Sequence, residues 1–113
     1  MSNLETTVET LIVGAFPLFK YKRQKYVNYQ NTQLLFDFVL PELKVLIEVQ
    51  GEQHFTYNKF YHGTKAEFDK QKFRDNLKVQ WATENNYTLI CVDSKQVNDF
   101  TVESFKQFIV ENM

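Results

Sequence analysis

The sequence predicts an α/β protein with a three-layer core, in which a mixed sheet of about four strands is flanked by helices. Two apolar runs, 34–40 and 44–50, follow each other across a short turn at Pro41 and Glu42, which predicts an antiparallel pair. Their dense apolar content indicates burial on both faces of the sheet. A further apolar run at 87–92 predicts another strand, and helical apolar stripes precede and follow these runs.

The predicted elements follow in the order α-β-β-β-α-β-α. An apolar stripe of Leu4, Val8, Leu11 and Ile12 predicts a first helix over about 3–14, ended by a glycine and a proline. The aromatic, alternating stretch 19–27 predicts the first strand, and 28–32 reads as a polar turn.

The second half of the chain begins with a loop, predicted over 56–63 because this stretch has no clear period. Thr64 and Glu67 then form a capping box, which predicts a long helix that runs to about Asn85. After the strand at 87–92, an apolar pattern over 100–110 predicts a closing helix.

Length and composition indicate one domain that spans residues 1–113. The chain has only three Gly and two Pro, which argues against disorder and against two domains joined by a linker. No segment resembles a signal peptide, and no apolar run approaches the roughly 20 residues that cross a bilayer. We therefore expect a soluble, intracellular, cytoplasmic protein with no membrane partner. Cys91, the only cysteine, lies in an apolar run and is expected to be a small buried side chain.

Acids inside apolar strands are the strongest chemical signal. Asp37 stands between Leu35 and Val39, and Glu48 stands within the second strand of the pair. A carboxylate buried without compensation costs several kcal/mol or takes up a proton. Two such acids on neighbouring strands indicate a site for Mg²⁺, a hard cation that prefers oxygen ligands, and the carbonyl of Val49 is a further candidate ligand.

These acids also have structural interpretations, which the sequence leaves open. Asp37 can cap backbone amides at a strand end, and Glu48 can form a buried salt bridge to Arg23 or Lys25. The long helix carries two apolar stripes on nearly opposite sides, one of Ala66, Phe73, Leu77 and Trp81 and one of Phe68, Val79 and Ala82. Asp75 lies in the second stripe, where we expect packing, although it can also pair with a neighbouring cation. Glu9 lies near the edge of the apolar face of the first helix.

The net charge of −1 is uninformative, but the basic residues gather in two segments, one around Arg23 and one after the acidic strands. Either segment can be a solvated surface or can bind phosphates. The candidates for nucleic-acid binding are Arg23, Lys25, Lys59, Lys72 and Arg74.

The acidic strands resemble the PD-(D/E)XK nuclease superfamily, with Asp37 followed by Glu48-Val49-Gln50 in place of the Glu-X-Lys triplet. From Thr6 to Val97 the chain resembles the branch of very-short-patch-repair-like and EDxHD homing endonucleases. The residues that carry this resemblance are Glu9, Arg23-Gln24, Phe36-Asp37-Phe38, Ile47-Glu48, Gly51-Glu52-Gln53-His54, Arg74-Asp75 and Tyr87-Thr88-Leu89-Ile90.

The resemblance implies a restriction-endonuclease-like fold and a role for several residues. Asp37 is implied as a metal ligand, His54 as the acid or base near the scissile phosphate, and Glu9 and Asp75 as supporting carboxylates. Gln50 stands where the superfamily has a lysine that positions or activates water. With one Cys and two His the chain lacks the ligands of the structural zinc site found in the branch's repair enzymes, which favours a minimal phage or mobile-element nuclease.

The sequence therefore predicts an Mg²⁺-dependent DNA endonuclease, in which Mn²⁺ is expected to substitute for Mg²⁺. A double-strand cut would need a homodimer or two successive nicks. The rival hypothesis is a degenerate nuclease-fold module that binds nucleic acid or a protein partner, and a third is an enzyme acting on branched DNA, single-stranded DNA or RNA.

Overall fold

Four strands form one mixed sheet in this protein, whose computed structural model describes residues 3–50 and 64–113. Strands β1, β2 and β3 pair antiparallel, whereas β4 lies parallel to β3 at the other edge. The strands are β1 (Lys22–Tyr29), β2 (Thr32–Leu40), β3 (Val45–Gln50) and β4 (Thr88–Asp93). The predicted α/β class with a mixed four-stranded sheet flanked by helices is confirmed.

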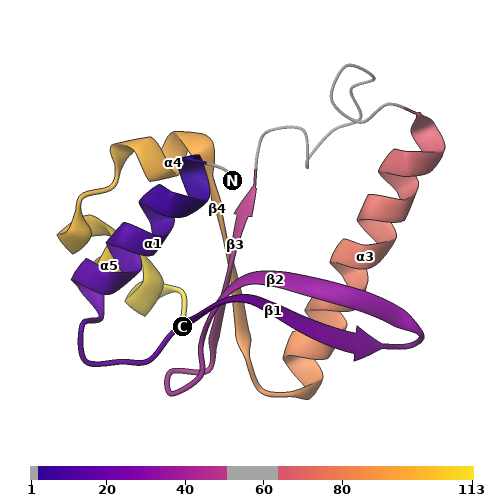
Figure 1. The fold of residues 1–113 in the computed structure, drawn as a ribbon, viewed down its shortest axis with the longest axis horizontal. Helices are drawn as coiled ribbons and strands as arrows, with labels where there is room; N and C mark the ends of the chain where they lie inside the picture. The colour runs from indigo at the N-terminus through magenta and orange to yellow at the C-terminus, as the bar shows by residue number, and fades with distance from the viewer. Residues whose placement is uncertain (1–2, 51–63) are drawn as a thin grey trace.

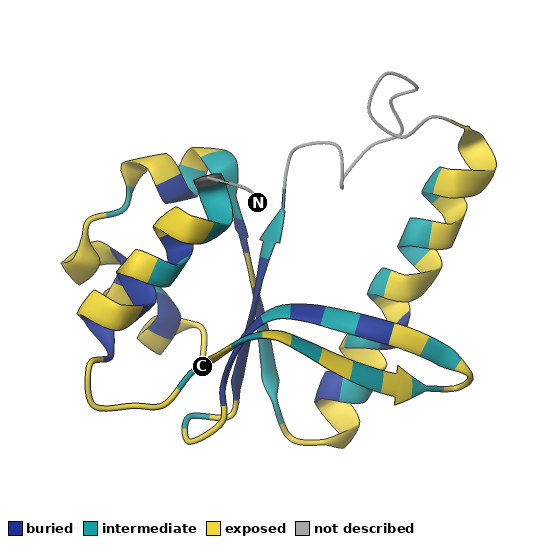
Figure 2. Ribbon diagram, in the orientation of Figure 1, coloured by how far each residue is buried: buried dark blue, intermediate teal, exposed yellow. Residues whose placement is uncertain are grey.

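Helices cover both faces of the sheet (Figure 1). On one face lie α1 (Asn3–Ala15), α4 (Ser94–Asp99) and α5 (Val102–Glu111), and on the other lies α3 (Lys65–Glu84). Each face has its own apolar core, one centred on Ile12, Ile47 and Phe105 and the other on Leu46 and Leu77. The outer sides of the helices are exposed (Figure 2). The predicted burial of the central strands on both faces is therefore confirmed.

The β1–β2 hairpin is longer than predicted. Gln30 and Asn31 have φ of 49° and 60°, so a two-residue turn joins Tyr29 directly to its partner Thr32. Two-residue turns with positive φ match the twist of paired strands. The predicted turn over 28–32 is therefore too wide, and the strands run on to the turn on both sides.

Helix boundaries also differ from the prediction in two places. Helix α1 ends at Ala15, one residue beyond the predicted end, and Gly14 lies inside it, where a Cβ would lie 3.0 Å from Cγ2 of Val102 on α5. The short helix α4 was not predicted, although Asp93 and Gln96 form a capping box that starts it. The predicted capping box of Thr64 and Glu67 is confirmed at the start of α3.

Strand β2 does not keep the regular alternation that we expected around Asp37. Leu34 and Phe36 pack in the core under α3, whereas Phe38 and Leu40 pack in the core under α1 and α5. In a regular strand residues two apart share a face, so the strand turns over between Phe36 and Phe38. Asp37 lies at this point.

Helix α3 buries a different side from the one we assigned to Asp75. Leu77 and Ala82 are buried and Trp81 packs against the same core, but Val79 is 54% exposed. The expected packing stripe of Phe68, Val79 and Ala82 is therefore wrong as a unit. Leu77 and Trp81, two members of the other predicted stripe, form the contact with the sheet.

Candidate active site

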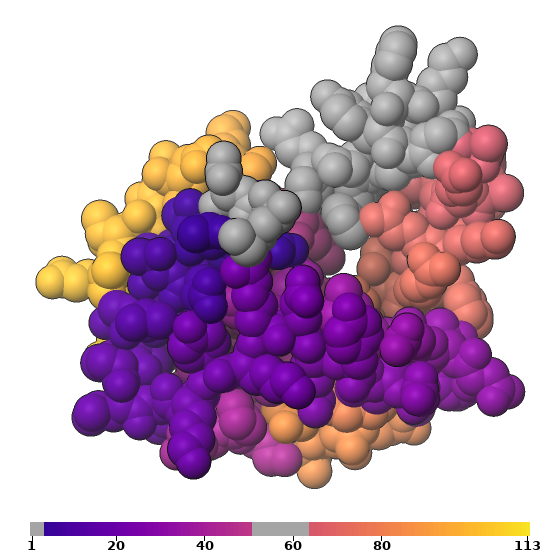
Figure 3. All heavy atoms as spheres, viewed as in Figure 1, coloured from indigo at the N-terminus to yellow at the C-terminus, as the bar shows by residue number. Residues whose placement is uncertain are grey.

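A polar cleft of about 720 Å³ lies between the β1–β2 hairpin, the end of β3 and α3. In the space-filling view the hairpin forms a continuous ridge that reaches from α1 to α3 (Figure 3). Asp37 and Glu48 line the cleft on the sheet side. The residues that α3 contributes to its wall are Gln71, Arg74, Asp75 and Lys78.

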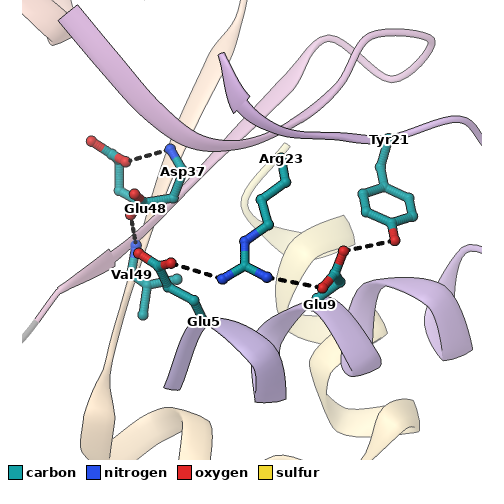
Figure 4. A network of polar contacts seen from close by, with 7 residues as sticks. All are labelled: Glu5, Glu9, Tyr21, Arg23, Asp37, Glu48 and Val49. Atoms are coloured by element: carbon teal, nitrogen blue, oxygen red, sulfur yellow. Dashed lines mark hydrogen bonds and ion pairs between the residues drawn. The ribbon is translucent and has the colours of Figure 1, made fainter. Parts of the chain in front are cut away.

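The two strand carboxylates lie where β2 and β3 stop pairing. The ladder between these strands covers three residue pairs and its last pair on this side is Phe38 with Ile47. Beyond it, the N–H of Asp37 donates to Oε2 of Glu48 at 3.0 Å, and the N–H of Val49 donates to Oδ2 of Asp37 at 2.8 Å (Figure 4). Each carboxylate thus satisfies a backbone amide that the sheet leaves unpaired. The structural interpretation, in which Asp37 caps a backbone amide, is thus met by the hydrogen bond from Val49.

Glu48 is buried, with only 4% of its surface exposed, and its other oxygen accepts a hydrogen bond from Nζ of Lys78. We had considered Arg23 and Lys25 as its structural partners, but the cation comes from α3. Burial, together with repulsion from Asp37, raises the pKa of Glu48 to about 7 although Lys78 opposes the shift. A carboxyl whose pKa lies near neutrality is a candidate active-site group.

Lys78 is the site residue that sequence analysis missed. Its ammonium also lies 5.7 Å from the ring centroid of Phe36, so the side chain is held from two sides. One signal was available, because Gln71, Asp75 and Lys78 recur at helical spacing and form one polar side of α3. Which strand this side faces depends on tertiary packing.

The donor chemistry of this site fits a hard divalent cation. Mg²⁺ is commonly held by one or two carboxylates and keeps several waters. Asp37 and Glu48 supply two, and Oδ1 of Asp37 accepts no hydrogen bond from the residues that the structure describes. Within that part of the chain no group of three His, Cys, Asp or Glu side chains is placed to share an ion. Two carboxylates, with water completing the coordination, are therefore the ligand set that these residues support.

Glu9 and Arg23 lie in a separate cluster, which we call the α1 network: Glu5, Glu9, Tyr21 and Arg23. The guanidinium of Arg23 donates to Glu5 at 2.9 Å and to Glu9 at 3.1 Å, and the hydroxyl of Tyr21 donates to Glu9 at 2.9 Å (Figure 4). The hydrogen bond to Glu5 raises the pKa of Arg23, and the bond to Glu9 raises that of Tyr21. Neither Glu9 nor Arg23 lines the cleft.

The other predicted site residues divide into three groups. Gln50, Val49, Asp75 and Arg74 line the cleft beside Asp37 and Glu48. Lys25 and Lys72 do not line the cleft. The ammonium of Lys25 lies 5.9 Å from the ring centroid of Trp81, and that of Lys72 lies 5.6 Å from the ring centroid of Phe68. The third group is His54, Lys59 and the predicted loop over 56–63, which lie outside the described residues.

Cys91 is exposed, so the expected burial of this side chain is wrong. It stands on β4 beside Glu48, its partner in the parallel ladder. Its neighbours Ile90 and Val92 are buried in the core on the α1 side, so Cys91 points to the other face of the sheet.

Comparison with known proteins gives two viral relatives of uncharacterised function. The chain is 38% identical over 60 residues to protein 307L of Invertebrate iridescent virus 6, which covers 53% of this chain and 30% of that protein. It is 31% identical over 87 residues to protein 033L of Invertebrate iridescent virus 3, covering 77% and 42%. The chain thus spans less than half the length of these curated relatives. No protein-family model matches it.

Among the described helices, none is long and apolar enough to cross a membrane.

Proposed function

We propose that this protein is a metal-dependent DNA endonuclease that hydrolyses phosphodiester bonds, built on the PD-(D/E)XK nuclease core. The observation that carries the proposal is the buried Glu48, held beside Asp37 where two strands diverge at the floor of an open polar cleft. A buried acid of raised pKa beside a second carboxylate, in an open polar cleft, is a typical active-site arrangement.

Asp37 and Glu48 would hold Mg²⁺, with Mn²⁺ able to replace it. When bound there, the cation would lower the pKa of water and neutralise negative charge on a phosphate. The hydrogen bonds from the backbone of Asp37 and Val49 fix both carboxylates in advance, so little ordering is needed on binding. His54 remains the predicted proton-transfer group, and Asp75 a supporting carboxylate on the cleft wall.

Lys78 supplies the cation that the Glu-X-Lys triplet lacks here. Gln50 lines the cleft but is uncharged, whereas the Lys78 ammonium contacts Glu48 directly. A half-buried ammonium at this place favours a phosphate oxygen and holds a proton that the leaving oxygen needs. The lysine role of the superfamily can therefore be filled from α3.

A second candidate function is supported by the same contacts. Both oxygens of Glu48 and one of Asp37 are already bonded to protein groups, which is sufficient to explain these acids as clamps between diverging strands. On this hypothesis the chain is a degenerate nuclease-fold module that binds nucleic acid or a protein partner through the cleft. The matches to proteins of two iridescent viruses support a viral setting for either function.

The test compares cleavage of supercoiled plasmid and branched DNA, with Mg²⁺ or Mn²⁺, by the native chain, Asp37→Asn, Glu48→Gln and His54→Ala. Asn at position 37 keeps an oxygen for the Val49 amide but removes the charge, so it separates the clamp from the metal ligand. We expect the Asp37 and Glu48 variants to lose at least about 100-fold in rate. Asp69→Asn, an exposed acid elsewhere on α3, is the control and should cut normally.

No cleavage by the native chain on any substrate, together with unchanged DNA binding by Asp37→Asn, would leave the binding module as the function.

A further inference from the structure

The β1–β2 ribbon turns over as a unit at one residue pair, Gln24 and Asp37. On β1, Arg23 bonds to α1 on one face of the sheet, whereas Lys25 lies over Trp81 of α3 on the other. On β2, Phe36 and Phe38 divide between the same two faces. Residues two apart in a regular strand share a face, so both strands of the ribbon are inverted at the same level.

The neighbouring strands keep their alternation through this region. On β3, Val45 and Ile47 face the α1 side and Leu46 faces the α3 side, and on β4 Ile90 and Val92 lie opposite Leu89. The inversion is therefore a local property of the ribbon and not a twist of the whole sheet.

The backbone of Gln24 provides the inversion. Its φ is 60°, in the left-handed region that side chains other than glycine rarely adopt. The other described non-glycine residues with positive φ lie in turns: Gln30, Asn31, Lys44 and Asn86. Gln24 is the exception, because it lies inside a strand.

The inversion coincides with the contacts that Asp37 makes to β3. Gln24 and Asp37 are opposite in register but are not ladder partners, although the pairs on either side of them are. At this level β2 also stops pairing with β3, and the amide and carboxylate of Asp37 bond to Glu48 and Val49 instead. Asp37 lines the cleft together with Leu35, so the inversion bears on these contacts to β3 and not on access to the cleft.

We infer that Gln24 is a positioning residue, whose left-handed backbone turns the ribbon over and thereby sets the Asp37 carboxylate against the Val49 amide, beside Glu48. The side chain of Gln24 is exposed, so the backbone conformation and not a side-chain contact does this. The metal-binding consequence rests on the proposed function, whereas the geometric one does not. Strained backbone that persists beside a reactive group is typical of active sites.

The test uses substitutions that differ in their tolerance of positive φ. Gln24→Gly and Gln24→Asn accept it, and Gln24→Val, which is β-branched, resists it. Asn28→Val is the matched control, because Asn28 is also exposed on β1 but has no positive φ. The first readout is the hydrogen-exchange rate of the Val49 amide, which reports its bond to Asp37. The second is Mn²⁺ affinity by calorimetry.

We expect Gln24→Val to speed exchange at Val49 as Asp37→Ala does, and to weaken Mn²⁺ binding by about 10- to 100-fold, the usual effect of losing a group that orients a ligand. Gln24→Gly, Gln24→Asn and Asn28→Val should match the native chain. If Gln24→Val does not fold, Gln24→Ala should show a smaller shift in the same direction.

Native exchange at Val49 in both Gln24→Val and Gln24→Ala would overturn the inference, even if the native chain binds metal and cuts DNA. Faster exchange in these variants would support it even if the native chain neither binds Mn²⁺ nor cuts, in which case only the proposed function fails.

Discussion

Each face of the sheet carries a cluster of one cation and two carboxylates, yet the two clusters differ in hydration and in geometry. In the α1 network the Arg23 guanidinium reaches both Glu5 and Glu9, and the three side chains are 20–29% exposed. In the second cluster, which consists of Asp37, Glu48 and Lys78, the side chain of Glu48 is 5% exposed, and this is the one acid among the described residues that the cation contacts.

The difference explains why the second cluster is the candidate site. A planar guanidinium that donates to two partly hydrated carboxylates provides each with a charge-assisted hydrogen bond, which is typical of a structural contact. A buried carboxyl with a raised pKa beside a second acid retains a drive to bind a cation. The two clusters have the same formal charge, yet the α1 network connects α1 to β1, whereas the cluster of Asp37, Glu48 and Lys78 is the candidate reactive site.

Removing the cation from the buried cluster should give the largest change in stability. Lys78→Met leaves Glu48 buried without its partner, and losing one member of a buried pair costs about 3–5 kcal/mol of unfolding free energy. Urea unfolding at pH 8 measures this. The loss should shrink at pH 5, where Glu48 is protonated.

Lys65→Met is the matched control, because Lys65 and Asp69 form an ion pair on the same helix with side chains 65% and 61% exposed. Such surface pairs contribute at most about 1 kcal/mol. Equal losses in the two variants would contradict the difference in burial on which the comparison depends.

The raised pKa of Glu48 predicts a pH dependence of stability with a definite sign. Between the ordinary value of 4.5 and about 7 the folded chain binds more protons than the unfolded chain, so the Glu48 contribution to stability falls as pH rises through this window. The full change is up to about 3 kcal/mol. It should be measured by urea unfolding in EDTA, as the difference between the native chain and Glu48→Gln.

That difference should be constant above about pH 7 and below about pH 4.5. A difference that does not vary with pH would mean that Glu48 keeps an ordinary pKa in the folded chain, and would contradict its burial as the feature that separates the two clusters.

The sequence predicts the regular parts of this fold well because their patterns are local. Ile47 and Leu46 alternate without interruption along β3, and Thr64 and Glu67 mark the start of α3. The inversion at Asp37 could not be predicted, since a glutamine at position 24 gives no signal of positive φ, as a glycine would.

The candidate site was predictable only where its signal is local. Asp37 and Glu48 were visible as acids within apolar strands, and the structure brings them together. Lys78 was not, because its contact with Glu48 spans 30 residues and depends on how α3 lies across the sheet. The exclusion of Arg23 from the cleft likewise depends on a tertiary contact with α1. Helix α4 was missed although Asp93 and Gln96 carry a readable local signal.

The smallest expected effect is a change in DNA binding, which compares Arg74 at the cleft with Arg23 in the α1 network. Arg74 is exposed, lines the cleft and forms no ion pair with any described residue, so its charge is available to a phosphate. Arg74→Gln should therefore weaken DNA binding by less than about tenfold and lower the slope of log Kd against log salt by about 1. Fluorescence anisotropy with a short labelled duplex, over a series of salt concentrations, measures both quantities.

Arg23→Gln is the matched comparison, because it removes the same charge from the α1 network. Since Glu5 and Glu9 already neutralise Arg23, its loss should destabilise the chain without changing the salt slope. Equal decreases in slope for the two variants would show that DNA also contacts the α1 side of the hairpin. The binding surface would then extend over both faces of the β1–β2 ribbon instead of the cleft alone.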